Sequence, residues 1–209
     1  MSDFIYLASQ SPRRQQLLTQ IGVRFQMLLA DADEDAESLE LVHDGETPHD
    51  YVDRVTRAKL EAARARLKSR GLPLAPILCA DTTVALDDLI IGKPIDADDA
   101  RQTLRRLAGV PHLVITAVAV ACDVDLGAGM LLSRTLLDVN TSVVHVAPLG
   151  DDEIDAYVAS GDSFGKAGSY AIQSRAAAWV RHIEGSYSGI MGLPLFETAQ
   201  LLKQAGVRF

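Results

Sequence analysis

The chain has 209 residues, of which 48% are hydrophobic and 23% are charged, and it carries a formal net charge of −8 at pH 7. This balance is typical of a soluble globular protein, and the length suits one domain over residues 1–209. The negative charge argues against nucleic acid as a partner, although a local basic pocket or a metal ion can still hold a polyphosphate.

The first predicted elements are two short strands that flank a helix. Residues 4–8 and 23–30 are apolar runs that predict strands. A serine–proline pair opens residues 11–20 and is typical of a helix cap followed by the first helical turn. Residues 31–46 are acidic and irregular, which indicates a solvated loop with at least one candidate functional carboxylate.

Residues 47–69 form the clearest predicted helix, because apolar residues recur there at helical spacing. Lys59 interrupts the apolar face, since it lies four residues after Val55 and seven after Val52. It either snorkels along the apolar surface or directs its ammonium group at a site beneath the helix.

Residues 77–86 predict a buried strand, and Asp81 lies in the middle of it. A carboxylate in such a strand is costly to bury unless it is paired, protonated or bound to a metal. Asp81 is therefore either a satisfied structural residue or part of a functional site.

The remaining predicted elements alternate between strands and helices. They are a turn and return strand that end at residue 91, a helix at 96–107, strands at 113–122 and 130–146 joined around 127–129, a helix at 151–160, a Gly-rich loop at 163–170, a strand at 176–183 and a helix at 195–204. This order predicts an α/β protein with a mixed sheet.

Cysteine usage and the N-terminal residues favour the cytoplasm. Cys79 and Cys122 lie in apolar, strand-like runs, so we expect both to be reduced core residues. The N-terminal apolar stretch is too short for a signal peptide, and the longest run without Asp, Glu, Lys or Arg, residues 107–122, is too short for a membrane helix. We therefore expect a cytoplasmic protein without a membrane partner.

Residues 9–14, Ser-Gln-Ser-Pro-Arg-Arg, lie between a predicted strand and a helix N-terminus, where free backbone N–H groups favour an anion. Arg13 and Arg14 oppose the helix dipole in this first turn, a cost that a bound anion would offset. Guanidinium groups also match phosphate oxygens well. The alternative is a solvated basic first turn.

Two lysines in glycine-containing turns are further candidates for anion contacts. Lys93 follows a strand and a glycine, and Lys166 lies in the stretch Gly-Lys-Ala-Gly at 165–168. The spacing of a P-loop is absent, and each lysine by itself is more often a surface turn residue.

A second carboxylate near Asp81 would complete a site for phosphoryl chemistry, and the acidic loop offers Asp31, Asp33 or Glu34. Two carboxylates suit a divalent cation that neutralises phosphate charge and lowers the pKa of a bound water. Lysine and arginine then stabilise charge on the leaving group. A phospho-aspartyl phosphatase is less favoured, because Thr83 stands where such enzymes usually carry a second aspartate.

These blocks, in this order, resemble the Maf family of nucleoside triphosphate pyrophosphatases across nearly the whole chain. The matching blocks are residues 7–14, 33–34, 51–52, 59, 80–82, 92–94, 166–173, 183–187 and 192–194. The resemblance implies a Maf/ITPase-like fold, with a mixed twisted sheet flanked by helices, two lobes and a central cleft.

The resemblance also implies an activity and a role for each candidate residue. It implies hydrolysis of a nucleoside triphosphate to the monophosphate and pyrophosphate, with Mg or Mn as the divalent metal, as house-cleaning of the nucleotide pool. Asp81 matches the catalytic general base and, together with Glu34, the metal-handling positions. The substrate-binding positions match Ser9, Arg13, Arg14, Lys59, Lys93 and Lys166. A homodimer is the assembly that the resemblance suggests.

Base choice is associated in the family with positions that match Arg13, Thr82 and Gln173, and the surrounding blocks resemble the branch that acts on dTTP and UTP. The amide of Gln173 offers both a donor and an acceptor, which suits the O4 and N3–H edge of thymine or uracil. The chain departs from the family pattern at Ala117, Gly165 and Ser174. The alternatives are the branch that acts on 7-methyl-GTP and a regulator of septum formation that senses nucleotide without turnover.

Overall fold

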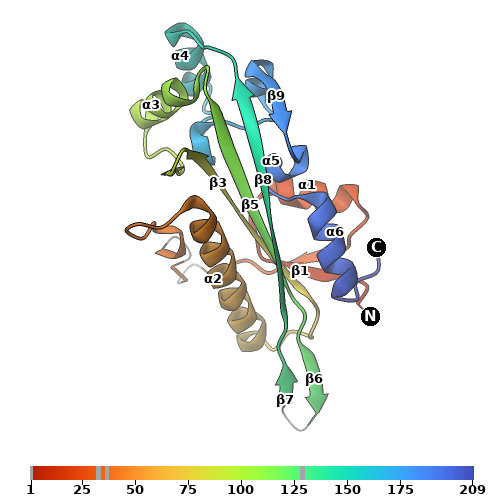
Figure 1. Ribbon diagram of the computed structural model, residues 1–209. Coiled ribbons are helices and arrows are strands. Elements are labelled where there is room, and N and C mark those ends of the chain that lie inside the picture. Colours follow the sequence, from red (N-terminus) through yellow and green to blue (C-terminus); the bar gives the residue numbers. More distant parts are fainter. Residues whose placement is uncertain (1, 32–33, 36–37, 128–129) are drawn as a thin grey trace.

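A mixed seven-stranded sheet forms the centre of the protein, seen here in a computed structural model that describes residues 2–31, 34–35, 38–127 and 130–209 (Figure 1). Its strands are β1 (Ile5–Leu7), β2 (Phe25–Met27), β3 (Ile77–Leu86), β4 (Leu89–Ile91), β5 (Pro111–Ala121), β8 (Thr135–Val146) and β9 (Val180–Glu184). The strand order is β2-β1-β3-β5-β8-β9, and β4 also pairs with β3. A separate two-stranded ribbon consists of β6 (Val124–Gly127) and β7 (Met130–Leu132).

Helices cover both faces of this sheet. They are α1 (Pro12–Gln20), α2 (Pro48–Ser69), α3 (Ala97–Leu107), α4 (Asp151–Ala159), α5 (Tyr187–Met191) and α6 (Leu195–Gln204), with short 3-10 helices η1 (Ser38–Glu40), η2 (Ala167–Ser169) and η3 (Arg175–Trp179). Helix α2 lies against β3 and β5 on one face, whereas α5 and α6 lie against β5 and β8 on the other, with α1 beside α5 (Figure 1). The predicted fold class, a mixed sheet flanked by helices, is confirmed.

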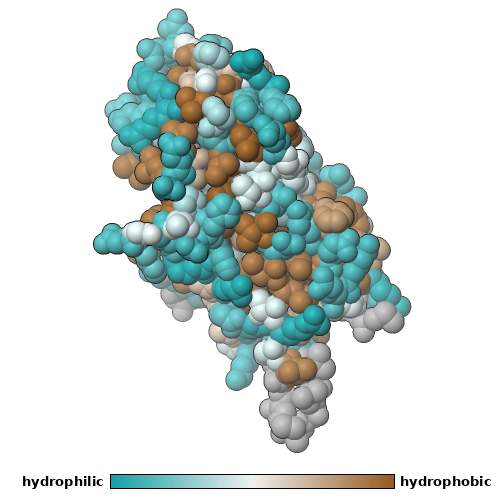
Figure 2. All heavy atoms as spheres, in the orientation of Figure 1, coloured by the Kyte–Doolittle hydropathy of each residue, from teal (hydrophilic) through white to brown (hydrophobic). Residues whose placement is uncertain are grey.

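Strand β3 contributes to both faces, because successive side chains of a strand point in opposite directions. Cys79 packs in the same core cluster as Leu60 of α2, whereas Leu78 and Ala80 join the larger core that includes Leu18 of α1. The outer surface of α2 is mostly hydrophilic, as expected for a helix whose apolar stripe faces a sheet (Figure 2). Successive side chains of β3 therefore pack on opposite faces of the sheet.

One edge of β3 is interrupted by a gap in the sheet. Strand β1 pairs with β3 only at residues 77–78, and β4 pairs with it only at residues 84–86. Strand β5 runs along the whole opposite edge, from Ile77 to Ala85 of β3. Residues 79–83 thus have a partner strand on one side only among the described residues, and Asp81 lies in the middle of this gap.

Local signals account for the elements that the sequence predicted well. The side chain of Thr47 accepts a hydrogen bond from the Asp50 N–H at the start of α2, and Asp96 does the same for Asp99 at the start of α3. The predicted helix at 195–204 and the predicted strand at 77–86 have the bounds of α6 and β3. Helix α1 ends at Gln20 as expected, although the Ser11 side chain makes no capping hydrogen bond.

Three predictions of local structure were wrong in extent or type. Residues 176–183 are a strand only from Val180 onward, because Ala176–Ala178 lack the β-branched side chains that favour strands and form η3 instead. Residues 23–30 contain only the short β2, and residues 130–146 divide into β7 and β8. The predicted connection around 127–129 lies partly outside the described residues.

Helix α5 lies in a stretch rich in serine and glycine, residues 185–189. Ser186 begins the helix, since its hydroxyl accepts the Gly189 N–H at 3.0 Å. Gly189 is required for packing, because a Cβ there would lie 2.6 Å from the side-chain oxygen of Asn140. The glycine therefore marks a close approach to β8 and not a turn.

Both cysteines are free, as expected, but only Cys79 is fully buried, and Cys122 is half-buried. Burial raises the pKa of the Cys79 thiol to about 12, which keeps it protonated. No helix of the described chain is both long enough and apolar enough to cross a membrane.

His112 makes the stability of the fold depend on pH. Its ring is 2% exposed, its Nε2 lies 2.7 Å from the Tyr170 hydroxyl, and burial lowers its pKa to about 4. The unfolded chain takes up this proton near pH 6.5, so the stabilisation from neutral His112 is complete above that pH and is lost as the pH falls toward 4. We expect a loss of about 3 kcal/mol over this range.

Urea unfolding at a series of pH values measures this effect. The variant His112→Gln should show a shallower decline of unfolding free energy between pH 6.5 and 4 than the parent. Equal slopes for the parent and His112→Gln would contradict the assignment.

Candidate active site

A cavity of about 1200 Å³ opens over the gap beside β3. It is lined by the residues that the family resemblance implies for the site. From the N-terminal region these are Ser9, Arg13, Arg14, Glu34 and Lys59, and from the rest of the chain Asp81, Thr82, Lys93, Lys166 and Gln173. Its walls come from the start of α1, the loop around η1, α2, β3, the end of β4, and the segment that contains η2.

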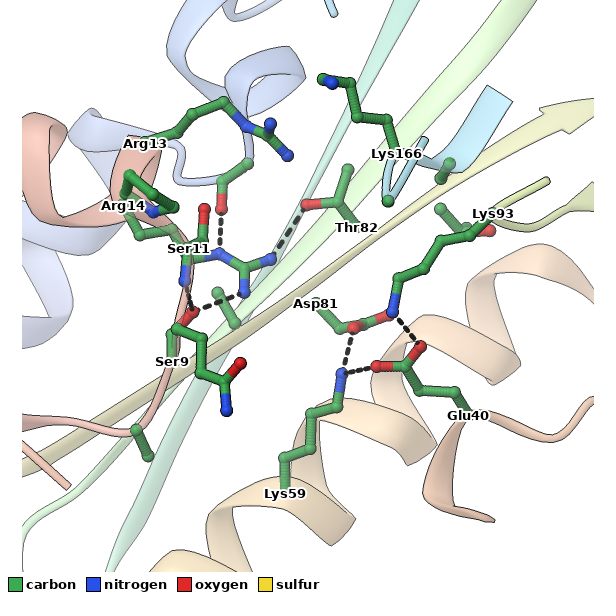
Figure 3. A pocket seen from close by; sticks show the side chains of 18 of the residues that line it. Ser9, Ser11, Arg13, Arg14, Glu40, Lys59, Asp81, Thr82, Lys93 and Lys166 are labelled. Carbon is green, nitrogen blue, oxygen red and sulfur yellow. Dashed lines mark hydrogen bonds and ion pairs between the residues drawn. The ribbon is translucent and has the colours of Figure 1, made fainter. Parts of the chain in front are cut away.

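Asp81 begins a chain of alternating charges on the α2 side of the sheet (Figure 3). The Lys59 ammonium donates to Asp81 Oδ1 at 2.6 Å and to Glu40 Oε1 at 2.7 Å. Lys93 donates to the other oxygen of Glu40 at 2.6 Å. Lys59 therefore directs its charge at a site beneath the helix, and it supplies the partner that a carboxylate in a buried strand requires.

The pKa values of this cluster follow from competition between burial and charge. Burial disfavours the charged ammonium of Lys59, but Asp81 and Glu40 outweigh it and raise the pKa of this lysine above its ordinary value. Burial alone would raise the pKa of Glu40, but Lys59 and Lys93 lower it below the usual range. Both Lys59 and Glu40 are thus charged at neutral pH.

Glu40 is a site residue that the sequence did not single out. Its backbone carbonyl accepts the Tyr51 hydroxyl at 3.0 Å, and Arg54 donates to the neighbouring carbonyls of Leu39 at 3.3 Å and Leu41 at 2.8 Å. Two side chains of α2 therefore hold three consecutive carbonyls of this loop. The acidic composition of the loop signalled a functional carboxylate, but only these long-range contacts distinguish Glu40 from its neighbours.

The other loop carboxylates have different partners. Arg66 donates to both oxygens of Glu34 and to the Leu28 carbonyl, and its hydrogen bonds lower the pKa of Glu34 to about 2. Asp31 pairs with Arg70 at 2.7 Å. Asp33 lies outside the described residues. Glu34 thus lines the cavity as the partner of Arg66 through both of its oxygens, whereas Glu40 pairs with the two lysines next to Asp81.

Arginines occupy the opposite side of β3, where α1 begins. Arg14 donates from Nε to the Gly192 carbonyl at 2.7 Å, from Nη1 to Ser9 Oγ at 3.1 Å, and from Nη2 to Thr82 Oγ1 at 3.3 Å (Figure 3). Arg13 donates to the Met191 carbonyl at 3.3 Å. Burial lowers the pKa of both guanidinium groups, yet arginine stays protonated in proteins.

Arg13 and Arg14 donate hydrogen bonds to neutral oxygen atoms. Among the described residues, no carboxylate lies within ion-pair distance of Arg13 or Arg14. Charged groups that are partly removed from water and contact only neutral acceptors favour an anionic ligand. The N-terminus of α1 adds to the positive potential at the same place.

The remaining candidates line the part of the cavity near η2. Lys166 donates to the Asp162 carbonyl at 2.6 Å, and burial and the charge of Arg13 lower its pKa. Gln173 is exposed, next to the buried side chains of Ala171 and Ile172. The hydroxyl of Thr82 is already engaged by Arg14, so this residue supports the arginine side of the cavity.

The fold and the site together define an α/β protein with a basic cavity that suits an anionic ligand. The chain belongs to the Maf family, since the family model described as Maf-like protein matches residues 4–205.

Several relatives named dTTP/UTP pyrophosphatase are similar to this chain over its full length. The relative from Albidiferax ferrireducens is 55% identical over 208 residues, which is 100% of both chains. Those from Ralstonia nicotianae and Burkholderia lata are each 58% identical, over 97% and 98% of this chain and 94% of theirs. A solved nucleoside triphosphatase (dITP/XTP pyrophosphatase) from Mycobacterium abscessus aligns over 69% of this chain and 75% of its own, with 15% identity and a TM-score of only 0.38.

Proposed function

We propose that this protein is a pyrophosphatase that hydrolyses dTTP and UTP to the nucleoside monophosphate and pyrophosphate. The observation that carries the proposal is the single cavity in which Asp81 and its lysines lie across β3 from Arg13 and Arg14. Relatives that are 54–58% identical carry the name dTTP/UTP pyrophosphatase. The family resemblance and the two free cysteines favour a cytoplasmic protein, and the resemblance favours a homodimer.

Asp81 is the general base in this proposal. It takes a proton from water as the water oxygen bonds to the α-phosphorus, and the bond from this phosphorus to the bridging oxygen breaks, so that pyrophosphate leaves with the electron pair. Lys59 donates a hydrogen bond to the Asp81 carboxylate and holds it in place. Lys93, Arg13 and Arg14 stabilise the negative charge that grows on the leaving pyrophosphate.

A divalent cation fits beside Asp81 by the chemistry of the donor set. Carboxylate oxygens of Asp81 and Glu40 converge on one positive atom, Lys59 Nζ, and hard cations such as Mg²⁺ and Mn²⁺ prefer oxygen ligands. When bound, the cation would neutralise phosphate charge and lower the pKa of a water molecule. We propose Asp81 and Glu40 as its protein ligands, with Glu34 as the alternative second carboxylate.

Binding of Mn²⁺ to the protein without nucleotide separates these two carboxylates. We expect Glu40→Gln to weaken Mn²⁺ binding by at least about tenfold in electron paramagnetic resonance titrations, because a direct ligand is lost. Glu34→Gln is the matched control and should stay within about twofold of the parent, since Arg66 already holds that carboxylate. The reverse result would make Glu34 the metal ligand.

Base selection belongs to the part of the cavity near η2. There the Gln173 amide would pair with the O4 and N3–H groups of thymine or uracil, and Lys166 and Arg13 line the same cavity. The names of the relatives favour this reading over the 7-methyl-GTP alternative.

A panel of nucleoside triphosphates tests the proposed function directly. Pyrophosphate should be released from dTTP and UTP with Mg²⁺ or Mn²⁺ and should cease on chelation of the metal. Orthophosphate as the first product would contradict the proposal. Faster turnover of 7-methyl-GTP than of dTTP and UTP would assign the protein to the branch that acts on 7-methyl-GTP. Tight nucleotide binding without any turnover would favour the regulator of septum formation.

A further inference from the structure

Two threonine hydroxyls connect Arg14 to the backbone of α5. Arg14 Nη2 lies 3.3 Å from Thr82 Oγ1, which lies 2.9 Å from Thr116 Oγ1. Thr116 Oγ1 in turn lies 2.8 Å from the carbonyl oxygen of Gly189. The two threonines face each other across the β3–β5 pair, where their positions are in register.

Thr116 is the donor to both of its neighbours in this chain. The guanidinium of Arg14 can only donate, and the carbonyl of Gly189 can only accept, whereas each hydroxyl has one hydrogen to donate. Thr116 therefore directs its one hydrogen at Thr82 Oγ1 and the Gly189 carbonyl, which lie on either side of it. Thr82 Oγ1 accepts from Thr116 and from Arg14, so both of its acceptor sites are engaged.

Burial makes this arrangement rigid. Thr116 has no exposed surface and is not among the residues that line the cavity. The acceptor at the end of the chain is fixed as well, because Gly189 is packed against Asn140 too closely for any larger residue. Arg14 also donates from Nε to Gly192, just after α5, so the same segment holds the guanidinium at two points.

We propose that Thr116 is a positioning residue of the active site. It touches no substrate, but it fixes the Thr82 hydroxyl and, through it, the plane of the Arg14 guanidinium. Three of the five guanidinium N–H groups are engaged by Gly192, Ser9 and Thr82, and the two that remain are available to the polyphosphate. This inference rests on the proposed function, since it assigns Arg14 to that substrate.

The test compares Thr116→Val with Thr116→Ser. Valine keeps the shape of threonine but removes the hydroxyl, and we expect it to lower kcat/KM for dTTP by about 10- to 100-fold. Inhibition by added pyrophosphate should weaken by about tenfold for the same reason. Serine keeps the hydroxyl and should stay within about twofold of the parent.

A structural defect alone would not give this pattern. Thr198 is also fully buried, and its hydroxyl has no hydrogen-bond partner in the described chain, so Thr198→Val should retain full activity. The ¹⁵N–¹H resonance of Arg14 Nε should shift or broaden in Thr116→Val and return in Thr116→Ser. If the valine variant does not fold, Thr116→Cys, with its weak S–H donor, should show an intermediate loss.

The outcomes separate this inference from the proposed function. A parent protein that releases no pyrophosphate from any nucleotide contradicts the function, while pyrophosphate affinity and the Arg14 resonance still report on Thr116. Parent-like kinetics and an unchanged resonance in Thr116→Val overturn the inference. Equal losses in the valine and serine variants also overturn it, because the hydroxyl would then be irrelevant.

Discussion

Asp81→Asn is expected to lower kcat for pyrophosphate release by about 10³-fold, within the range that general bases contribute. The amide has nearly the shape of the carboxylate, but it cannot take a proton from water at neutral pH and is a poor ligand for a hard cation. Asp81 lies at the gap in the sheet, where it is both 7% exposed and directed at the cavity. The measurement is the rate at saturating dTTP with Mg²⁺.

The same variant should remain folded. Lys59 loses one of its two carboxylate partners but keeps Glu40 at 2.7 Å, so no charge is left without a partner. We expect the free energy of unfolding to change by about 1 kcal/mol or less. Asp88→Asn, in the exposed turn between β3 and β4, is the matched control and should keep full activity. Turnover in Asp81→Asn above a tenth of the parent rate would remove Asp81 from the role of base.

Several residues that the sequence singled out and that line this cavity break local rules. Asp81 is a carboxylate in an apolar strand, Lys59 is a cation on an apolar helix face, and Arg13 and Arg14 are cations at the wrong end of a helix. Each of these charges is at a position that disfavours it, and this can be recognised from the sequence alone. In the structure, Lys59 pairs with Asp81 and Glu40. Arg13 and Arg14 donate to neutral oxygen atoms.

The parts that could not be predicted depend on pairing between distant segments. The gap beside β3 exists because β1 stops at Leu7 and β4 begins its pairing at Val84, and no local pattern encodes where two strands leave a third uncovered. Glu40 differs from the other carboxylates of the acidic loop because Tyr51 and Arg54 of α2 donate hydrogen bonds to the carbonyls of residues 39–41. No sequence pattern distinguishes Thr116 either, because threonine is a residue that any strand favours.

Arg14→Lys is the second substitution with a large expected effect, a fall in kcat/KM of about 10²- to 10³-fold. A lysine ammonium is a compact point charge that cannot reach Gly192, Ser9 and Thr82 together in the planar geometry that the guanidinium provides. The positive charge would be conserved, but the two N–H groups that face the polyphosphate would lose their fixed direction. Steady-state kinetics with dTTP measure the loss.

Arg13→Lys is the sharpest comparison, because the two arginines are adjacent and carry equal charge. Arg13 makes one backbone hydrogen bond, to Met191 at 3.3 Å, so its guanidinium is less constrained and its replacement should cost about tenfold. If charge alone mattered, the two variants would lose the same small factor. A larger fall in kcat/KM for Arg14→Lys would instead show that activity depends on the direction of the Arg14 N–H donors. Ser9, Thr82 and Gly192 set that direction.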